Sequence, residues 1–337
     1  MEGKRVVFFE VEPWEQDFLR DKLEHHAELS FFSHRLTFDN VHEAENANYI
    51  AAFIYSDFSQ TVLDKLPHLK GLATMSVGCD HIDLPEAARR KIIVSNVPNY
   101  GPNTVAEQTM ALLLALSRNI VPSVERTRHG EYDYTGLSGW DLNGKTIGVV
   151  GTGKIGALVA QAAKGLGMKV VGYDPKPNPA VAQKTGLEYM PLPELLKQSD
   201  VITLHVPLCD ETKHMLSTEQ FKQMKKGAVL INTARGGLVD INALIEALDN
   251  GTVAQAGLDV LEDENILKEE RQLFSKYFNL HDYQTAMADH VLMRDPRVIV
   301  TPHNAFNSKE SLHNILQTTV DNIVGMMTGD ATNIVNQ

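Results

Sequence analysis

The 337-residue chain has few cysteines, no long apolar run and too short an apolar start for a leader segment. Its two cysteines, Cys79 and Cys209, form no CxxC pair. This excludes a zinc ribbon, a dithiol redox motif and a disulfide scaffold, and it suits a cytoplasmic location. The longest strongly apolar run, 110–116, is far shorter than the ~20 residues that a membrane span needs. The run at 6–9 is too short for a signal peptide.

Positive charge is also scarce, because 31 Lys and Arg face 43 Asp and Glu, for a formal net charge of −12. A nucleic-acid partner is therefore not expected, since proteins that bind polyanions by neutralising phosphates are normally basic. Hydrophobic residues make up 43% and charged residues 22%, as in an ordinary globular protein and unlike a disordered chain. At about 150 residues per domain, the length predicts roughly two domains.

Short apolar runs alternate with helix-like stretches in two series, which predicts an α/β fold with two doubly wound parallel sheets. The first series of expected strands is 5–11, 49–56, 69–76 and 92–97. The second is 146–151, 169–174, 201–206, 227–232, 254–260 and 297–302. Helices are expected at 14–24, 59–66, 84–89, 103–117, 155–166 and about 308–328. For the helix at 103–117, Asn103 or Thr104 is the expected N-cap.

The segment Gly151-Thr-Gly153-Lys-Ile-Gly156 follows an apolar strand and opens a helix. In a dinucleotide-binding turn, the first glycine allows the tight turn and the second admits a pyrophosphate. The third permits close helix–strand packing. The next strand ends at Asp174, whose carboxylate would accept hydrogen bonds from the ribose hydroxyls of the adenosine half. A carboxylate repels a 2′-phosphate, so NAD(H) is favoured over NADP(H).

Three further expected strands end in polar clusters, which contain Arg235, Asp259 with Glu264, and His303. Ligands of open α/β sheets bind outside the carboxyl ends of the strands, so these clusters should share an edge with the glycine loop. Reduction of a carbonyl needs a guanidinium to anchor and polarise it, and an imidazole to deliver a proton. Glu264 or Asp259 would hold the imidazolium by charge pairing. Taken singly, Arg235 would be an ordinary surface charge, His303 a structural or solvated residue, and Glu264 part of a solvated acidic turn. No metal site is predicted, and the neighbouring pairs His281/Asp282 and Asp289/His290 are left open as a weak alternative.

Seven segments in this order resemble the D-isomer-specific 2-hydroxyacid dehydrogenase family, over nearly the whole chain. They are SVGCDHID (76–83), NVPNYGPNTVAE (96–107), TIGVVGTGKIG (146–156), DVITLHVPLCDETKHML (200–216), GAVLINTARGGLVD (227–240), AGLDVLEDE (256–264) and VTPHNAF (300–306). The resemblance implies reversible reduction of a 2-keto acid by NADH to the D-2-hydroxy acid.

The resemblance also implies residue roles. Arg235 would bind and polarise the substrate, His303 would be the acid/base, and Glu264 would pair with His303. Val77 and Gly78 would offer backbone N–H groups to the substrate carboxylate. Asp259 would lie beside the nicotinamide. The remaining cofactor contacts would come from Lys154, Ile155, Val206, Pro207, Thr212, Thr233 and Ala234.

By the same resemblance, a Rossmann-type NAD-binding domain, 101–305, is inserted into a flavodoxin-like substrate domain, 1–100 and 306–337. The substrate would be enclosed between the two domains. The helix 103–117 would contribute to a homodimer interface. Its apolar residues Met110, Leu113, Leu114 and Leu116 suit that role, although burial in the core explains them equally well.

Within the family, Tyr100 and Phe306 look most like the D-lactate dehydrogenase branch and would bound a small apolar pocket. The long segment 265–302 departs from the pattern and leaves the choice of pyruvate open. One alternative is the same chemistry on a larger or different 2-keto acid. The other is an NAD(H)-sensing interaction protein on the same fold, which can keep the catalytic residues.

Overall fold

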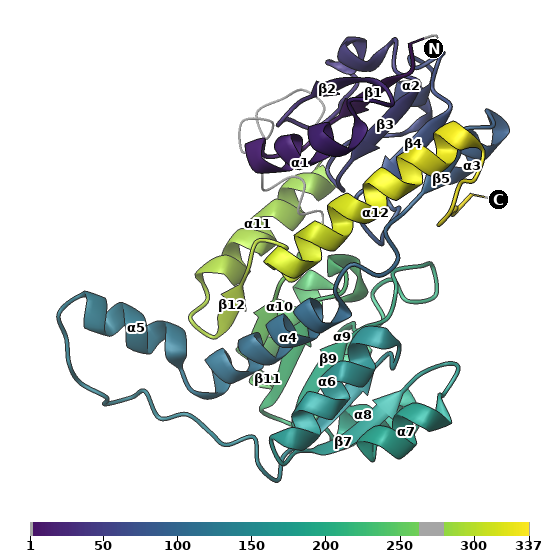
Figure 1. Cartoon of the computed structure of the whole chain (residues 1–337). Coiled ribbons are helices and arrows are strands. Elements are labelled where there is room, and N and C mark those ends of the chain that lie inside the picture. Colours follow the sequence, from purple (N-terminus) through teal and green to yellow (C-terminus); the bar gives the residue numbers. More distant parts are fainter. Residues whose placement is uncertain (1–2, 263–279, 337) are drawn as a thin grey trace. The chain divides into compact units, whose positions relative to one another are not determined.

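The computed structural model describes residues 3–262 and 280–336, and gives only the helical backbone for 280–286. The chain divides into two compact units, Met1–Gly101 with Asn307–Gln337, and Pro102–Phe306 (Figure 1). The first unit is therefore discontinuous in sequence. Within the described ranges, no helix is both long and apolar enough to cross a membrane.

The first unit contains a five-stranded parallel sheet of order β2-β1-β3-β4-β5, the flavodoxin-like order. Its strands are β1 Arg5–Phe8, β2 Glu28–Phe31, β3 Tyr49–Ala52, β4 Gly71–Thr74 and β5 Ile93–Ser95. Its helices are α1 Pro13–Leu23, α2 Gln60–Leu63, α3 Leu84–Arg89 and α12 Lys309–Thr328, with a short 3₁₀ helix at Val41–Ala44. The sequence patterns did not predict β2, because this edge strand is only partly buried and shows no continuous apolar run.

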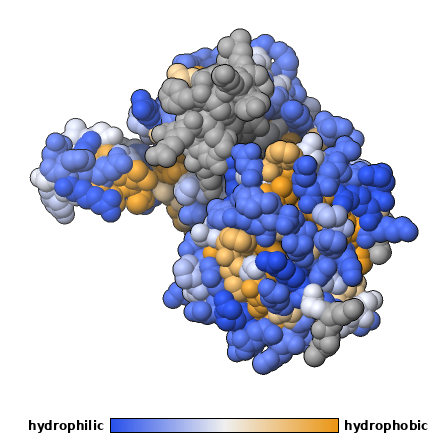
Figure 2. Space-filling view, turned by 90° about the horizontal axis from the view of Figure 1, so that it is seen from above, coloured by the Kyte–Doolittle hydropathy of each residue, from blue (hydrophilic) through white to orange (hydrophobic). Residues whose placement is uncertain are grey.

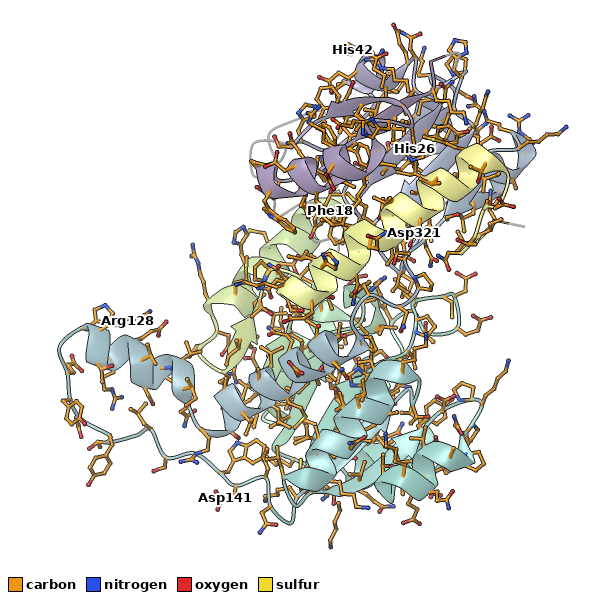
Figure 3. All side chains as sticks on the ribbon, viewed as in Figure 1. Phe18, His26, His42, Arg128, Asp141 and Asp321 are labelled. Carbon is orange, nitrogen blue, oxygen red and sulfur yellow. The ribbon has the colours of Figure 1, made fainter. Side chains whose placement is uncertain are left out.

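The C-terminal helix α12 packs on the first sheet. Ser308 caps it by accepting the Ser311 amide at 3.1 Å. The Phe18 ring of α1, labelled in Figure 3, lies edge-on to the His313 ring of α12. The two ring centroids are 5.3 Å apart. Beyond the helix, the side chain of Asn336 accepts the Val94 amide at 3.0 Å, which attaches the C-terminal tail to β5.

The second unit contains a seven-stranded parallel sheet of order β12-β11-β10-β9-β6-β7-β8. Its strands are β6 Thr146–Val150, β7 Lys169–Tyr173, β8 Glu188–Tyr189, β9 Val201–Leu204, β10 Ala228–Asn232, β11 Val253–Leu258 and β12 Val298–Val300. The first six strands in chain order have the order of a dinucleotide-binding sheet, and β12 is added beside β11. The direction of chain progression reverses between β6 and β9, which is where such sheets bind ligands.

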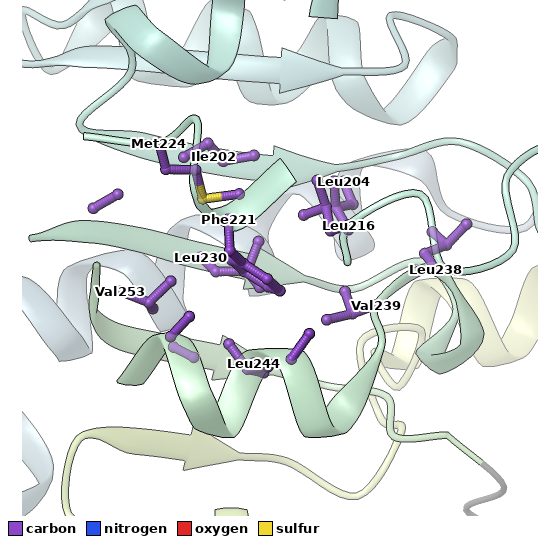
Figure 4. Close-up of a cluster of buried hydrophobic side chains, with 14 of the residues drawn as sticks. Ile202, Leu204, Leu216, Phe221, Met224, Leu230, Leu238, Val239, Leu244 and Val253 are labelled. Carbon is purple, nitrogen blue, oxygen red and sulfur yellow. The ribbon is translucent and has the colours of Figure 1, made fainter. Parts of the chain in front are cut away.

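Helices cover this second sheet. They are α4 Pro102–Ser117, α5 Ile120–Arg128, α6 Lys154–Gly165, α7 Pro179–Thr185, α8 Leu192–Gln198, α9 Thr218–Phe221, α10 Ile241–Asp249 and α11 Leu280–Arg294, with a 3₁₀ turn at Gly236–Leu238. Figure 4 shows Phe221, Leu230 and Leu244 pointing into one shared apolar core. The expected N-cap of α4 is wrong, because the helix already begins at Pro102. Asn103 and Thr104 therefore lie inside its first turn.

The α/β class with two doubly wound parallel sheets is confirmed. The buried strands are the reason that the sequence patterns worked. All residues of β3, β4, β9 and β10 are buried, so each strand shows as a continuous apolar run.

Candidate active site

The glycine loop lies at the reversal point of the second sheet. Gly151 has a φ of 91°, and a Cβ on it would lie 2.7 Å from the carbonyl carbon of His205. A Cβ on Gly156 would lie 2.0 Å from the Gly151 oxygen, so neither position has room for a side chain. A Cβ on Gly153, by contrast, would meet no described atom within 4 Å. Open space therefore adjoins the N-terminus of α6, where unpaired N–H groups can hold a phosphate.

Asp174 follows β7 and is held by its neighbours. Its Oδ2 accepts the Thr152 amide at 2.8 Å and the Thr152 hydroxyl at 3.0 Å, while Oδ1 accepts the Lys176 amide at 2.9 Å. Burial alone would raise the pKa of Asp174, but these hydrogen bonds outweigh burial and hold the pKa below its ordinary value. The carboxylate therefore stays charged near neutral pH.

The loop after β9 begins at His205, a residue that sequence reasoning did not single out. Its amide donates to the Val150 carbonyl at 2.7 Å, and its Nε2 lies 2.9 Å from the Thr203 hydroxyl. Desolvation lowers the pKa of His205 to about 3, so the imidazole is neutral at physiological pH. Further along, the Thr212 hydroxyl donates to the Pro207 carbonyl at 2.7 Å and closes the loop.

The loop after β10 carries Arg235. Asn232, buried at the end of the strand, brackets this loop by accepting the Ala234 amide at 3.0 Å and donating to the Arg235 carbonyl at 2.9 Å. The Thr233 hydroxyl lies 2.8 Å from the Thr109 hydroxyl of α4, which fixes the loop against that helix. Asn232 and Thr109 therefore position Arg235 and Thr233. Sequence spacing could not reveal them, because Asn232 acts through hydrogen bonds to the loop backbone and Thr109 meets Thr233 from 124 positions away.

The loop after β12 is organised by Asp259 of the β11 end. The Asp259 carboxylate is buried and accepts the Thr301 hydroxyl, the Asn304 amide at 3.1 Å and the Ala305 amide at 2.8 Å. Its backbone carbonyl accepts the His303 amide at 2.8 Å. His303 itself has a φ of 49°, in the left-handed region. Desolvation raises the pKa of Asp259, and the three hydrogen bonds and the nearby His303 offset only part of this effect.

Arg235, Asp259 and His303 therefore follow three adjacent strands, since β11 pairs with both β10 and β12. Glu264, the expected partner of His303, lies outside the described residues. Close to that segment, Glu262 accepts His214 Nε2 at 2.7 Å and ties the loop after β9 to the end of β11.

In the first unit, Val77 and Gly78 follow β4. Their carbonyls accept the Asn96 amide group at 2.8 Å and the Ser76 hydroxyl at 2.7 Å, respectively. Within the described part of the chain, neither of their N–H groups donates a hydrogen bond. Tyr100, near the end of this first segment, accepts the Asn314 side chain on its carbonyl at 2.9 Å.

The described residues contain no group of three or more His, Cys, Asp or Glu side chains arranged to hold a metal ion. The neighbouring pairs His281/Asp282 and Asp289/His290 lie on α11, of which residues 280–286 are described only as backbone.

Residues 110–305 match the family model for the NAD-binding domain of D-isomer specific 2-hydroxyacid dehydrogenases. The chain is 37% identical to the D-lactate dehydrogenase of Escherichia coli over 90% of each protein. It belongs to the D-isomer-specific 2-hydroxyacid dehydrogenase family. A glyoxylate reductase of Korarchaeum cryptofilum is 34% identical over 94% of this chain and 92% of that protein. The structure of Aquifex aeolicus D-lactate dehydrogenase with NAD and lactic acid superimposes with a TM-score of 0.89. It is 35% identical over 98% of this chain and 99% of that one.

The resemblance read from the sequence, including the likeness to D-lactate dehydrogenases, is thus confirmed. The chain is an NAD-dependent 2-hydroxyacid dehydrogenase, an oxidoreductase with a Rossmann-type cofactor unit. The residues present fit NAD(H). The space beside Gly153 suits the pyrophosphate, and the charged Asp174 beyond the next strand suits an unphosphorylated ribose.

Proposed function

We propose that this dehydrogenase interconverts a small 2-keto acid and the D-2-hydroxy acid, with pyruvate and D-lactate as the favoured pair. The D-lactate dehydrogenase of E. coli and the Aquifex enzyme with bound lactic acid support this choice. The similarly distant glyoxylate reductase makes a two-carbon acid the main competitor.

The observation that carries the proposal is the placement of Arg235, Asp259 and His303 at three adjacent strand ends, on the edge that also carries the glycine loop. Bound NADH supplies the hydride. Arg235 anchors the carboxylate and polarises the carbonyl of the keto acid, because a guanidinium offers a fork of donors. His303 delivers the proton to the forming alkoxide. Glu264 pairs with His303 and holds the imidazolium in place.

In the first unit, we propose that the N–H groups of Val77 and Gly78 bind the substrate carboxylate. Hydrogen bonds at both of their carbonyls hold this turn in one conformation, and Val77 is 47% exposed. Tyr100 contacts the substrate side chain and limits its size.

For the cofactor, Asp174 accepts the ribose hydroxyls, and the amides after Gly153 bind the pyrophosphate. Asp259 would lie beside the nicotinamide, next to the Thr301–Ala305 loop that it organises. The other proposed contacts are Gly151, Lys154, Ile155, Gly156, Val206, Pro207, Thr212, Thr233 and Ala234.

A homodimer formed through the cofactor-binding unit is part of the proposal. Of the four apolar residues of α4, Met110, Leu113 and Leu116 are buried in the core of the unit, whereas Leu114 is 39% exposed. Helix α5, in contrast, has no buried residue among its nine, and its Ile120 and Val124 are 50% and 40% exposed. Apolar side chains gather along this helix at the left of Figure 2. The helix ends at Arg128, and the chain returns past Asp141 to β6 (Figure 3).

The function is tested by following NADH oxidation over pyruvate, glyoxylate, hydroxypyruvate, branched-chain and aryl 2-keto acids, with chiral analysis of each chiral product. We expect the highest kcat/KM with pyruvate and a D-lactate product. An L-product would contradict the stereochemistry, and a larger preferred acid would contradict the choice of pyruvate. Tight NADH binding without turnover of any acid would favour an NAD(H)-sensing protein.

A further inference from the structure

Two residues outside the expected site contact Asp174 through a chain of hydroxyl groups. Thr152, the residue between the first two glycines of the loop, is only 3% exposed. Its Oγ1 lies 3.0 Å from Asp174 Oδ2 and 2.8 Å from the phenolic oxygen of Tyr189 on the edge strand β8. That phenolic oxygen also lies 3.1 Å from the backbone nitrogen of Asn178.

Only one arrangement of hydrogens satisfies these contacts. An ionised carboxylate can only accept hydrogen bonds, so Thr152 donates its single hydroxyl hydrogen to Asp174. The Thr152 oxygen must then accept a hydrogen bond from Tyr189. The Tyr189 hydroxyl therefore donates to Thr152 at 2.8 Å and not to the Asn178 carbonyl at 3.3 Å. Tyr189 in turn accepts the Asn178 N–H. A chain of hydrogen bonds therefore runs from the Asn178 N–H through the Tyr189 and Thr152 hydroxyls to the Asp174 carboxylate.

These hydrogen bonds determine which oxygen of the Asp174 carboxylate can still accept a hydrogen bond from a ligand. Oδ2 is occupied by the amide and the hydroxyl of Thr152. Oδ1 accepts the Lys176 amide alone among the described residues, and an ionised carboxylate oxygen can accept a second donor. Rotation of the carboxylate would break the contacts with Thr152. The accepting oxygen is therefore held in one orientation before any ligand binds.

We propose that Thr152 and Tyr189 are positioning residues that set the preference for NAD(H) over NADP(H), by holding Asp174 in the orientation in which Oδ1 accepts a ribose hydroxyl. This inference rests on the proposed role of Asp174. Because the orientation is fixed in advance, a ribose hydroxyl meets an acceptor at no reorganisation cost, whereas a 2′-phosphate meets an immobile negative charge.

The test uses Tyr189→Phe and Thr152→Val, which remove one hydroxyl each, with Thr152→Ser as the variant that keeps it. Tyr132→Phe, at a residue 99% exposed on the loop after α5, is the matched control for loss of a phenol. Dissociation constants for NADH and NADPH are measured without substrate by fluorescence titration, and thermal unfolding checks the fold of each variant.

Loss of one hydrogen bond in the chain should lower the ratio of the NADPH to the NADH dissociation constant by roughly three- to tenfold, mainly through weaker NADH binding. Thr152→Ser and Tyr132→Phe should keep the wild-type ratio. If Thr152→Val fails to fold, Tyr189→Phe decides the test.

Unchanged ratios in Tyr189→Phe and in folded Thr152→Val would overturn the inference. Asp174→Asn, measured in the same way, separates this failure from failure of the underlying role. If Asp174→Asn lowers the ratio while the hydroxyl variants do not, only the positioning chain is wrong. If Asp174→Asn also keeps the wild-type ratio, the role of Asp174 is wrong as well.

Discussion

Asp174 and Asp259 stand at strand ends of the same sheet, and both carboxylates accept three hydrogen bonds from nearby loops. Asp174 is bonded to residues two and 22 positions away and remains partly exposed. Asp259 is 1% exposed and is bonded to a loop more than 40 positions away. The pKa of Asp174 is lowered, and that of Asp259 is raised.

The difference fits the two roles that we propose for these residues. On Asp174, one carboxylate oxygen has capacity left for a ligand, so the group can select a cofactor. On Asp259, both oxygens serve the Thr301–Ala305 loop, so the group determines where His303 lies. Burial separates the two roles. Water cannot replace the donors that a buried acceptor such as Asp259 loses, whereas it can do so at the partly exposed Asp174.

The largest effect is expected from Asp259→Asn. In either orientation, the new amide NH₂ faces a backbone N–H, of Asn304 or of Ala305, at a buried position. We expect unfolding to be easier by about 1–3 kcal/mol and kcat to fall roughly 10- to 100-fold because His303 shifts. Urea unfolding and steady-state kinetics on one preparation measure both effects. Wild-type values for both would show that Asp259 does not organise this loop.

Asp174→Asn is the matched substitution at the other carboxylate. Its amide oxygen can keep both contacts with Thr152, and water can replace the lost contact to the exposed Lys176 amide. We expect unfolding within about 0.5 kcal/mol of wild type, with a clear loss of discrimination against NADPH. The same urea unfolding and the two dissociation constants test this. A loss of stability as large as that of Asp259→Asn would remove the contrast between the two residues.

The smallest effect is the pH dependence of stability. The lowered pKa of Asp174 stabilises the fold above its ordinary carboxyl pKa near 3.9, and this stabilisation is lost as the pH falls through the folded-state value. The raised pKa of Asp259 acts in the opposite sense, because its contribution is lost as the pH rises through the folded-state value. For each Asn variant, its free energy of unfolding is subtracted from that of the wild type. Around pH 4, this difference should rise with pH for Asp174→Asn and fall with pH for Asp259→Asn. Parallel slopes would contradict the two shifts.

Buried strands and their polar ends could be predicted from the sequence. Continuous apolar runs marked β6, β9 and β10, and the glycine spacing marked the turn into α6. The partly exposed β2 and the two-residue β8 carry no such run and were not expected. Helix α5 lacks a buried face, so the sequence shows no apolar stripe that would predict it.

The side-chain contacts that position the site could not be predicted. Thr109 meets Thr233, and Tyr189 meets Thr152, over long separations that no motif or periodicity encodes. Asp259 was expected beside the nicotinamide, but its hydrogen bonds to the loop around His303 appear only when β11 and β12 are paired. The role of Glu264 stays a prediction, because that residue lies outside the described part of the chain.

The most direct test of the account is His303→Asn, with turnover and NADH binding measured on the same protein. Asparagine adopts the left-handed backbone that position 303 requires, so the loop should be kept while the proton donor is removed. We expect kcat for keto-acid reduction to fall about 10²- to 10⁴-fold, with the NADH dissociation constant unchanged. Turnover close to wild type would contradict His303 as the acid/base and, with it, the proposed mechanism.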